Sequence, residues 1–211
     1  TPVAGIRGYI NILRAWGIED EGLREEAITA IDRESRRMAR LCSDLLSVIR
    51  SEEMVDYRSI RYDINGVCRE VLASAATRYM AKGFEFVAPD EAPLWLYGDP
   101  DRIAEALGIL VDNACKYAVS AEDKRIHIRA VPSGRVVEIS VCDHGPGIRE
   151  REARRLFRPF SKSSSEAANS APGVGLGLAL CRNLARDMGG SLRLEVHVPE
   201  GACFVLSLRR G

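Results

Sequence analysis

An aspartate and two glycines follow an apolar stretch in the second half of the chain. Residues 136–142, mostly valine and isoleucine, indicate a buried strand, and they are followed by the run Asp143-His144-Gly145-Pro146-Gly147-Ile148. A carboxylate followed by glycines lets a side chain and the backbone approach a ligand closely. The same residues also make ordinary turns, so this run alone leaves a ligand pocket and a plain turn equally open.

A second glycine series stands near residue 175. Gly173, Gly175 and Gly177 alternate with apolar residues and lead into a helical pattern. Free backbone amides at the positive end of a helix suit a polyphosphate. The series lacks the lysine of a P-loop and the spacing of a dinucleotide fingerprint, and it does not follow a strand directly. It predicts phosphate binding, with a flexible hinge as the alternative.

Three polar side chains of different chemistry fall within one turn of a predicted helix: Asn113, Lys116 and Tyr117. An amide oxygen can hold a hard cation, an ammonium group can reach a phosphate, and a phenol can flank a flat base. Together they suit a nucleotide with its metal ion. The alternative for Asn113 is an exposed helix end with ordinary polar residues.

A helical hairpin precedes the elements that would position these residues. One helix starts at Thr1-Pro2, residues 17–22 form a polar connection, and a longer helix spans about 23–50. Apolar residues in the longer helix alternate at spacings of three and four, as in a coiled coil. Further apolar residues widen this seam, so the hairpin predicts half of a bundle completed by a second copy. Packing of the hairpin on its own domain is the alternative.

A mixed α/β domain is expected after the hairpin. We predict two domains, residues 1–56 and 57–211, because the pattern changes near 56–59. Asp63 and Asp99-Pro100 read as helix starts. The predicted helices span about 63–82, 99–118, 149–156 and 173–188, and the predicted strands span 84–87, 94–96, 124–131, 136–142, 191–196 and 202–208.

Charge and cysteine usage exclude several classes of protein. Thirty basic residues balance thirty acidic ones, so no overall field favours nucleic acid or an anionic membrane. No stretch is long and apolar enough to span a bilayer, and we expect a cytoplasmic piece without membrane contact, whose parent could be anchored upstream. Without paired CxxC spacing, neither a zinc site nor a disulfide is expected. All six cysteines are interpreted as buried, inert thiols: Cys42, Cys68, Cys115, Cys142, Cys181 and Cys203.

Four short motifs occur in one order along the chain. Asp112-Asn113-Ala114-Cys115-Lys116-Tyr117, the run 143–148, Leu156-Phe157-Arg158-Pro159-Phe160 and the series 173–178 resemble the N, G1, F and G2 boxes of sensor histidine kinases. The resemblance covers essentially the whole chain. It implies an α+β fold: an antiparallel helical hairpin, half of a dimeric four-helix bundle, followed by a Bergerat-type α/β sandwich with a mixed sheet.

The resemblance also implies a role for each motif. Asp143 would accept a hydrogen bond from the adenine amino group of ATP, and Gly145, Gly147 and Ile148 would shape the base pocket beside Tyr117. Asn113 would ligate Mg²⁺ and Lys116 would contact phosphate. The loop 161–172 would be a lid. The remaining nucleotide contacts implied are Phe160, which with Phe157 forms the lid's hinge, Lys162 at the γ-phosphate, and Gly173, Val174, Gly175, Leu176, Gly177 and Leu178 at the triphosphate.

Two departures from the family pattern stand out. Ile109 occupies a position where the family often has a second asparagine, one turn before Asn113. In the family, the Thr-Pro pair directly follows a His-Glu-x-Arg segment whose histidine is phosphorylated, and this chain begins at Thr1. None of His127, His144 and His197 has the required helical context. Thr1 matches a position that helps to dephosphorylate the response regulator, a role conditional on the preceding turn.

The predicted function is that of an ATP-dependent protein histidine kinase core. A homodimer would form through the hairpin, and the phosphoryl group would pass from ATP to a histidine and then to a response-regulator aspartate. The piece should bind nucleotide without phosphorylating itself. The alternatives are a nucleotide-binding pseudokinase that acts as a dimeric scaffold, and another kinase of the same ATP-binding superfamily, such as an anti-sigma serine kinase or a mitochondrial-type dehydrogenase kinase.

Overall fold

A computed structural model describes most of the chain. The described residues are 2–15, 21–50, 59–89, 92–161, 175–195 and 200–210. The chain divides into two compact units, Thr1–Ile49 and Arg50–Gly211, and each is considered by itself. The predicted domain boundary at residues 56 and 57 lies outside the described residues and stays a prediction.

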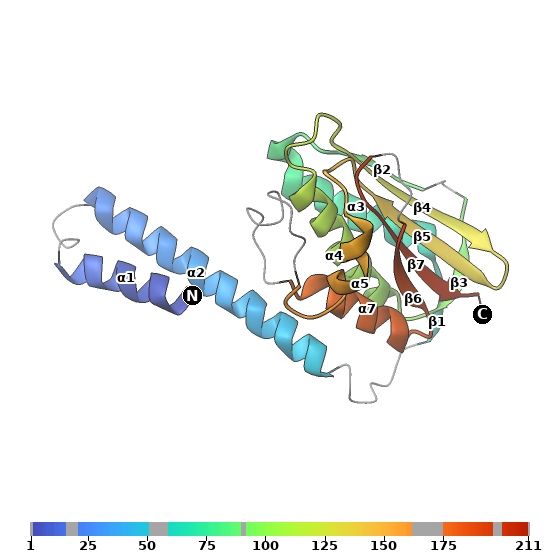
Figure 1. Cartoon of the computed structure of the whole chain (residues 1–211), viewed down its shortest axis with the longest axis horizontal. Helices are drawn as coiled ribbons and strands as arrows, with labels where there is room; N and C mark the ends of the chain where they lie inside the picture. Colours follow the sequence, from blue (N-terminus) through green and yellow to red (C-terminus); the bar gives the residue numbers. More distant parts are fainter. Residues whose placement is uncertain are drawn as a thin grey trace. The chain divides into compact units, whose positions relative to one another are not determined.

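The first unit is a hairpin of two helices, α1 (Pro2–Ala15) and α2 (Glu21–Arg50), which run side by side (Figure 1). Ala27 and Ala30 of α2 are buried, at 3% and 4% exposure, while Ile28 between them is 53% exposed. The hairpin therefore leaves apolar side chains uncovered on another face. Among the described helices, none combines the length and the apolar character needed to cross a membrane.

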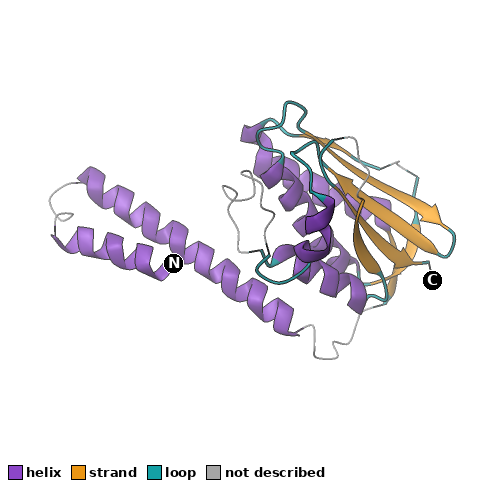
Figure 2. Ribbon diagram, in the orientation of Figure 1, coloured by secondary structure: helices purple, strands orange, loops and turns teal. Residues whose placement is uncertain are grey.

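The second unit is built on a mixed five-stranded sheet. Its strand order is β2-β4-β5-β7-β6, in which β2 runs parallel to β4 and the other neighbours are antiparallel. Helices pack against one face of this sheet, so the unit has two layers (Figure 2). The predicted fold class is confirmed. The strands are β2 (Glu85–Val87), β4 (Arg125–Ser133), β5 (Val136–Cys142), β6 (Ser191–Glu195) and β7 (Cys203–Arg209).

Three helices form the second layer: α3 (Ile64–Tyr79), α4 (Pro100–Tyr117) and α7 (Gly177–Asp187). A short 3-10 turn, η1 (Met80–Lys82), extends α3 and ends at Gly83, whose φ is +70°. Alternate residues of β5 face these helices, because side chains of a strand point to opposite faces in turn. Val137, Ile139 and Val141 are accordingly at most 1% exposed.

Both predicted helix caps are present. The Asp63 carboxylate accepts hydrogen bonds from the backbone N–H groups of Asn65 and Gly66, at 3.1 and 3.0 Å. The Asp99 carboxylate does the same for the N–H of Asp101 at 3.1 Å, with proline at the first helical position. These bonds satisfy donors that a helix start otherwise leaves unpaired, and so they fix where α3 and α4 begin.

One strand was missed by the sequence prediction. β1 (Ile60–Asp63) pairs antiparallel with β3 (Trp95–Gly98) in a separate two-stranded sheet. Four residues are too few to show a clear alternation, and the pairing partner lies far along the chain. The capping residue Asp63 also connects this sheet to α3, because its Oδ1 accepts the Leu94 N–H at 2.8 Å.

Candidate functional site

Asp143 directly follows the last residue of β5 and is almost fully buried, at 6% exposure. Its Oδ1 accepts a hydrogen bond of 2.8 Å from the Gly145 N–H and one of 3.3 Å from the Ala202 N–H. The Asp143 N–H in turn donates to the Ala202 carbonyl at 2.9 Å. The carboxylate is thus held both by its own turn and by the segment that enters β7.

Burial changes the acidity of this carboxyl group. Desolvation raises the pKa of Asp143 from 3.8 to about 6, while the N–H groups of Gly145 and Ala202 oppose the rise. The group is therefore ionised at neutral pH but titrates just below it. An ionised carboxylate in a dry site is a strong acceptor for a ligand N–H.

The glycines after Asp143 are required by close contacts. A Cβ on Gly145 would lie 2.9 Å from Asp143 Oδ1 and 3.1 Å from the Tyr117 carbonyl oxygen. Gly147 has a φ of +71°, and a Cβ there would lie 2.9 Å from the Gly201 carbonyl oxygen. No larger side chain fits between the end of α4, this turn and the start of β7.

Gly201 and Ala202 belong to the site, and the sequence interpretation missed both. Gly201 has a φ of +76°, and a Cβ there would overlap the backbone carbonyl of Asp143. Ala202 supplies the backbone donor and acceptor that hold Asp143. The only sequence signal was a glycine just before the last predicted strand, which is ordinary turn chemistry.

A hollow of about 430 Å³ borders the turn. Its walls combine Gly145, Gly147 and Ile148 with Leu194 and Gly201. The structure therefore gathers part of the predicted nucleotide contacts in one concave surface. The predicted residues of α4 do not line this hollow.

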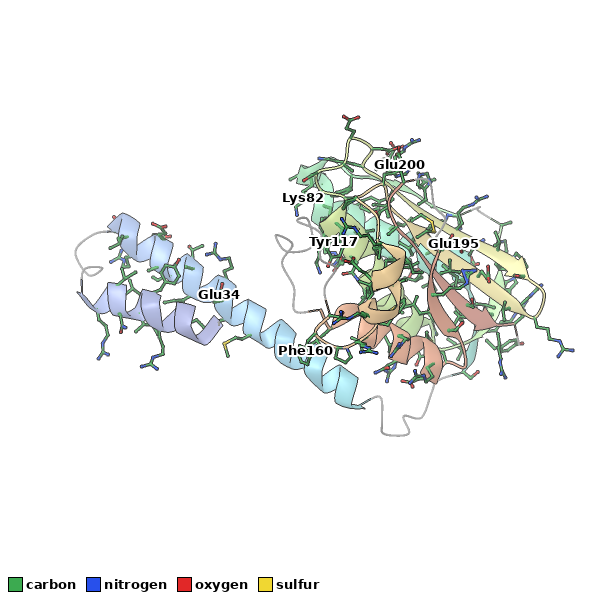
Figure 3. All side chains as sticks on the ribbon, viewed as in Figure 1. Glu34, Lys82, Tyr117, Phe160, Glu195 and Glu200 are labelled. Atoms are coloured by element: carbon green, nitrogen blue, oxygen red, sulfur yellow. A yellow bond between two sulfur atoms is a disulfide. The ribbon has the colours of Figure 1, made fainter. Side chains whose placement is uncertain are left out.

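Asn113, Lys116 and Tyr117 lie half-buried near the C-terminal end of α4. A Cβ on Gly177, the first residue of α7, would lie 3.9 Å from Asn113 Nδ2 and 3.2 Å from Ile109 Cγ2. The start of α7 thus lies directly against the Asn113 amide, with Ile109 as its apolar neighbour. Figure 3 labels the side chain of Tyr117. Desolvation raises the pKa of Tyr117, so its phenol stays protonated at neutral pH.

The F-box residues anchor a short helix to the sheet. Leu156, at the end of α5 (Glu150–Leu156), and Phe157 are buried. The Phe157 ring meets Phe204 of β7 edge-on at 6.3 Å between centroids, and the Arg182 guanidinium lies 5.8 Å from the centre of the same ring. These contacts tie α5 to α7 and β7.

Phe160 differs from Phe157, because the residue is 63% exposed and its φ is +61°. A Cβ on Gly175 would lie 2.5 Å from the Ser161 carbonyl oxygen. Residues 161 and 175, between which most of the predicted lid falls, are therefore in contact. Leu176 is buried and Leu178 half-buried at the start of α7. Four predicted site residues lie outside the described residues: Thr1, Lys162, Gly173 and Val174.

The prediction of six free, inert thiols is wrong for two of them. Cys142 and Cys203 form a disulfide between β5 and β7, with Cα atoms 4.0 Å apart. They are direct partners in the strand register, which spacing rules cannot detect across 61 positions. The prediction holds for Cys68, Cys115 and Cys181, since they are buried and desolvation raises each thiol pKa to about 12. The Cys42 side chain lies outside the described part.

The donor set fits a nucleotide with a hard cation. The Asn113 amide oxygen is a suitable ligand type for Mg²⁺, and the adjacent helix start of α7 offers backbone N–H groups to phosphate. Because Gly145 has no side chain, the space beside the Asp143 carboxylate stays open. Within the described residues, no cluster of three or more histidine, cysteine or acidic side chains offers a separate metal site.

Comparison with known proteins supports the same interpretation. Residues 98–211 match the family model "Histidine kinase-, DNA gyrase B-, and HSP90-like ATPase", and residues 1–53 match "His Kinase A (phospho-acceptor) domain". The adaptive-response sensory kinase SasA of Thermosynechococcus vestitus is 31% identical over 179 residues, which cover 83% of this chain and 46% of that protein. The sensor histidine kinase YkoH of Bacillus subtilis is 27% identical over 98% of this chain and 44% of its own length. The chain thus spans about half the length of the curated relatives it matches.

Solved structures agree with the fold. The catalytic domain of histidine kinase ThkA superposes with a TM-score of 0.61 at 26% identity, over 72% of this chain and 98% of that one. The histidine kinase AdeS of Acinetobacter baumannii, 21% identical, shares the fold over 100% of this chain and 96% of its own, with a TM-score of 0.75. The chain therefore belongs to the histidine kinase-, DNA gyrase B- and HSP90-like ATPase family, and its two successive domains form the transmitter core of a sensor histidine kinase.

Proposed function

We propose that this chain binds ATP with Mg²⁺ and forms the kinase core of a two-component signalling protein. In the whole protein, the γ-phosphoryl group would pass to a histidine on the helical hairpin and then to an aspartate of a response regulator. One observation carries the proposal: a buried, ionisable carboxylate is held at a strand end by two backbone N–H groups.

The geometry of that carboxylate suits adenine. Both backbone N–H groups donate to Oδ1 of Asp143, and within the described part of the chain Oδ2 receives no hydrogen bond. Oδ2 is therefore available to the exocyclic amino group of the base. A buried hydrogen bond to a charged acceptor contributes about 1.5–3 kcal/mol, which is enough to set the preference for adenine.

The phosphate side is formed by α4 and α7. We assign Asn113 as the Mg²⁺ ligand and Lys116 as a phosphate contact, because both lie on the turn of α4 beside the start of α7. When bound, the ion would neutralise charge on the transferring phosphoryl group. The backbone from Gly175 to Leu178 would hold the phosphates. Lys162, Gly173 and Val174 keep their predicted contacts as part of this proposal, and Thr1 keeps its conditional role in dephosphorylation.

The partners and the location extend the proposal. The uncovered apolar side chains of the hairpin, including Ile10 and Ile28, fit a homodimer. The histidine kinase ThkA, which shares the fold at 22% identity, was solved in complex with a response regulator protein, and ShkA, at 23%, with AMPPNP. We propose a receiver domain as the partner and ATP as the nucleotide. We also place this piece in the cytoplasm, where both are found.

A phosphorylation assay on the whole protein tests the proposal. The full-length parent is incubated with ATP labelled on the γ-phosphate and with Mg²⁺, and the label should be acid-labile and base-stable, as expected for phosphohistidine. Asp143→Asn should lower nucleotide affinity by about tenfold or more, because the amide carries no charge and presents a donor to the adenine amino group. Unchanged affinity would show that the pocket assignment is wrong.

The same assay distinguishes a kinase from a nucleotide-binding scaffold. Intact ATP binding without any label on the parent protein would favour a nucleotide-binding scaffold over a kinase. Ile109 is the feature that keeps this alternative open, since it places an apolar side chain beside Asn113 and Gly177.

A further inference from the structure

Four side chains form a row across the outer face of the sheet, the face away from the helices. His127 of β4 is paired with Cys142 of β5, Cys142 with Cys203 of β7, and Cys203 with Glu195 of β6. Residues directly opposite in antiparallel strands point to the same face and lie close together. The two cysteines are therefore neighbours by register, with a histidine and a glutamate on either side (Figure 3 labels Glu195).

The alternation of β5 shows which face this is. Val141 packs under the helices at 1% exposure, whereas Cys142 is half-buried on the opposite face. Glu138 lies on the same face, four positions before Cys142, and accepts hydrogen bonds of 3.2 Å from the Arg193 guanidinium. Solvent reaches this polar face, and so would a small oxidant or reductant. Cys203, at 6% exposure, is the more enclosed partner.

We propose that Cys142 and Cys203 form a reversible thiol–disulfide site that controls nucleotide binding, an inference that rests on the proposed function for its ligand. The disulfide joins the two strands at the point where they supply the Asp143 site. Hydroperoxides are the oxidants and small dithiols the reductants of this site.

The chemistry balances with one hydroperoxide. The Cys142 thiol loses its proton and the thiolate attacks the O–O bond of hydrogen peroxide, which forms a sulfenic acid and releases water. Cys203 then attacks the sulfenic sulfur, the S–O bond breaks, and the oxygen leaves as a second water with the Cys203 proton. Two thiols are oxidised and one peroxide is reduced to two waters. An external dithiol reverses the step by disulfide exchange and becomes a disulfide itself.

His127 is placed to accept the thiol proton. It is the register partner of Cys142, and its ring lies 5.5 Å from that of His144. Desolvation is the main reason that the pKa of His127 lies below its ordinary value, followed by the charges of His144 and Arg125. The imidazole is therefore neutral at neutral pH and can act as a base.

Coupling to the nucleotide site follows from chain connectivity. Asp143 and Ala202 are the neighbours of Cys142 and Cys203 in the chain, and two hydrogen bonds join them. The Asp143 N–H donates to the Ala202 carbonyl, and the Ala202 N–H donates to the Asp143 carboxylate. With the disulfide, the two strand ends are held together covalently. Without it, no covalent bond between these cysteines restrains the two strand ends, so nucleotide binding must order the site at a cost in affinity.

The first measurement counts protected thiols. The chain is treated with hydrogen peroxide, denatured, alkylated and analysed by peptide mass spectrometry, and in parallel after reduction with dithiothreitol. Cys142 and Cys203 should be the two protected residues among six in the oxidised sample, and all six should be alkylated after reduction. Cys142→Ser and Cys203→Ser should each abolish protection, while Cys68→Ala, which removes a buried unpaired thiol, should leave it unchanged.

The second measurement follows binding and backbone protection in both redox states. Affinity for a non-hydrolysable ATP analogue with Mg²⁺ should be roughly threefold to tenfold higher in the oxidised chain. Hydrogen exchange at the amides of Gly145 and Ala202 should be slower in the same state. Cys142→Ser and Cys203→Ser should match the reduced wild type in both assays and should not respond to peroxide.

Three results would overturn different parts of the inference. If peroxide never protects Cys142 and Cys203, the modification site is wrong. If the disulfide forms but neither affinity nor exchange at Gly145 and Ala202 changes, the coupling is wrong. If exchange slows on oxidation but neither redox state binds the nucleotide, the proposed function fails and the coupling between the disulfide and Asp143 stands.

Discussion

The backbone of Ala202 holds Asp143 from 59 positions away, with its N–H 3.3 Å from the carboxylate oxygen Oδ1. Gly201 makes this approach possible, since a side chain there would overlap the Asp143 carbonyl. The acidic residue of the candidate site is thus held in place by the loop that enters the last strand, as well as by its own turn.

Gly201→Ala should damage both stability and binding. The new methyl group would overlap the Asp143 carbonyl and force a left-handed backbone on alanine, so we expect a loss of about 2–5 kcal/mol in urea denaturation. Nucleotide affinity, measured under native conditions, should fall with it. Gly134→Ala is the matched control, because Gly134 also has a positive φ of +60° but has nothing within 4 Å of an added Cβ. It should cost about 1 kcal/mol and leave affinity unchanged. Equal losses for the two variants would contradict the contact.

Nucleotide affinity should depend on pH through Asp143. The pKa of Asp143 in the folded protein is about 6, and under the proposed function the ionised form would accept the adenine amino hydrogen. Affinity for adenosine, which lacks titrating phosphates, should therefore rise as the pH increases through 6. Asp143→Asn should bind weakly with a flat profile between pH 5 and 7. A wild-type profile equally flat over that range would count against the carboxylate as the base contact.

Stability should depend on pH in the opposite direction. Folding raises the pKa of Asp143 from 3.8 to about 6, so the folded state binds this proton more tightly than the unfolded state does. The stabilisation is fully present below pH 3.8 and is lost as the pH rises through 6, a change of about 3 kcal/mol. The difference in unfolding free energy between wild type and Asp143→Asn, measured by urea denaturation, should follow this curve. A difference independent of pH would show that Asp143 titrates normally.

Asn113→Ala should remove the effect of magnesium on binding. Wild-type affinity for an ATP analogue should be higher with Mg²⁺ than with a chelator, and the variant should lose about tenfold or more of that gain. Binding in the chelator should change little, because the proposed contact between Asp143 and the base would remain. Asp143→Asn is the complementary control, since it should weaken binding in both conditions. Retention of the full magnesium effect in Asn113→Ala would require another ligand.

Tyr79→Phe should affect stability alone. The Tyr79 hydroxyl donates to Asp112 Oδ1 at 3.2 Å, and the Arg78 guanidinium lies 3.1 Å from the same carboxylate oxygen, so these contacts connect α3 to α4. Loss of the hydroxyl should cost about 0.5–1.5 kcal/mol and lower the melting temperature by roughly 2–6 °C. Affinity for nucleotide should stay within twofold of wild type. A larger change in affinity would mean that the Asp112 contacts also position Asn113.

Helices and strands were predicted well where the interactions that form them join residues close in the sequence. Asp63 and Asp99 cap helices because their carboxylates reach N–H groups two and three residues later, a contact that the sequence alone encodes. β5 was predicted from its run of mostly valine and isoleucine, and it ends at Cys142 as expected. β1 was missed, since a four-residue strand exists only through its pairing with β3.

The motif residues of the candidate site could be identified from the amino-acid sequence: the Asp143 turn, the polar end of α4 and the glycine entry to α7. Their types and spacing predict the chemistry of an acceptor, a cation ligand and a phosphate cradle. The positions of Gly201 and Ala202 beside Asp143, and of Cys142 opposite Cys203, became evident from the three-dimensional structure alone. Both facts follow from the register of β5 against β7, which is set by packing across the whole sheet and leaves no mark in the spacing of either segment.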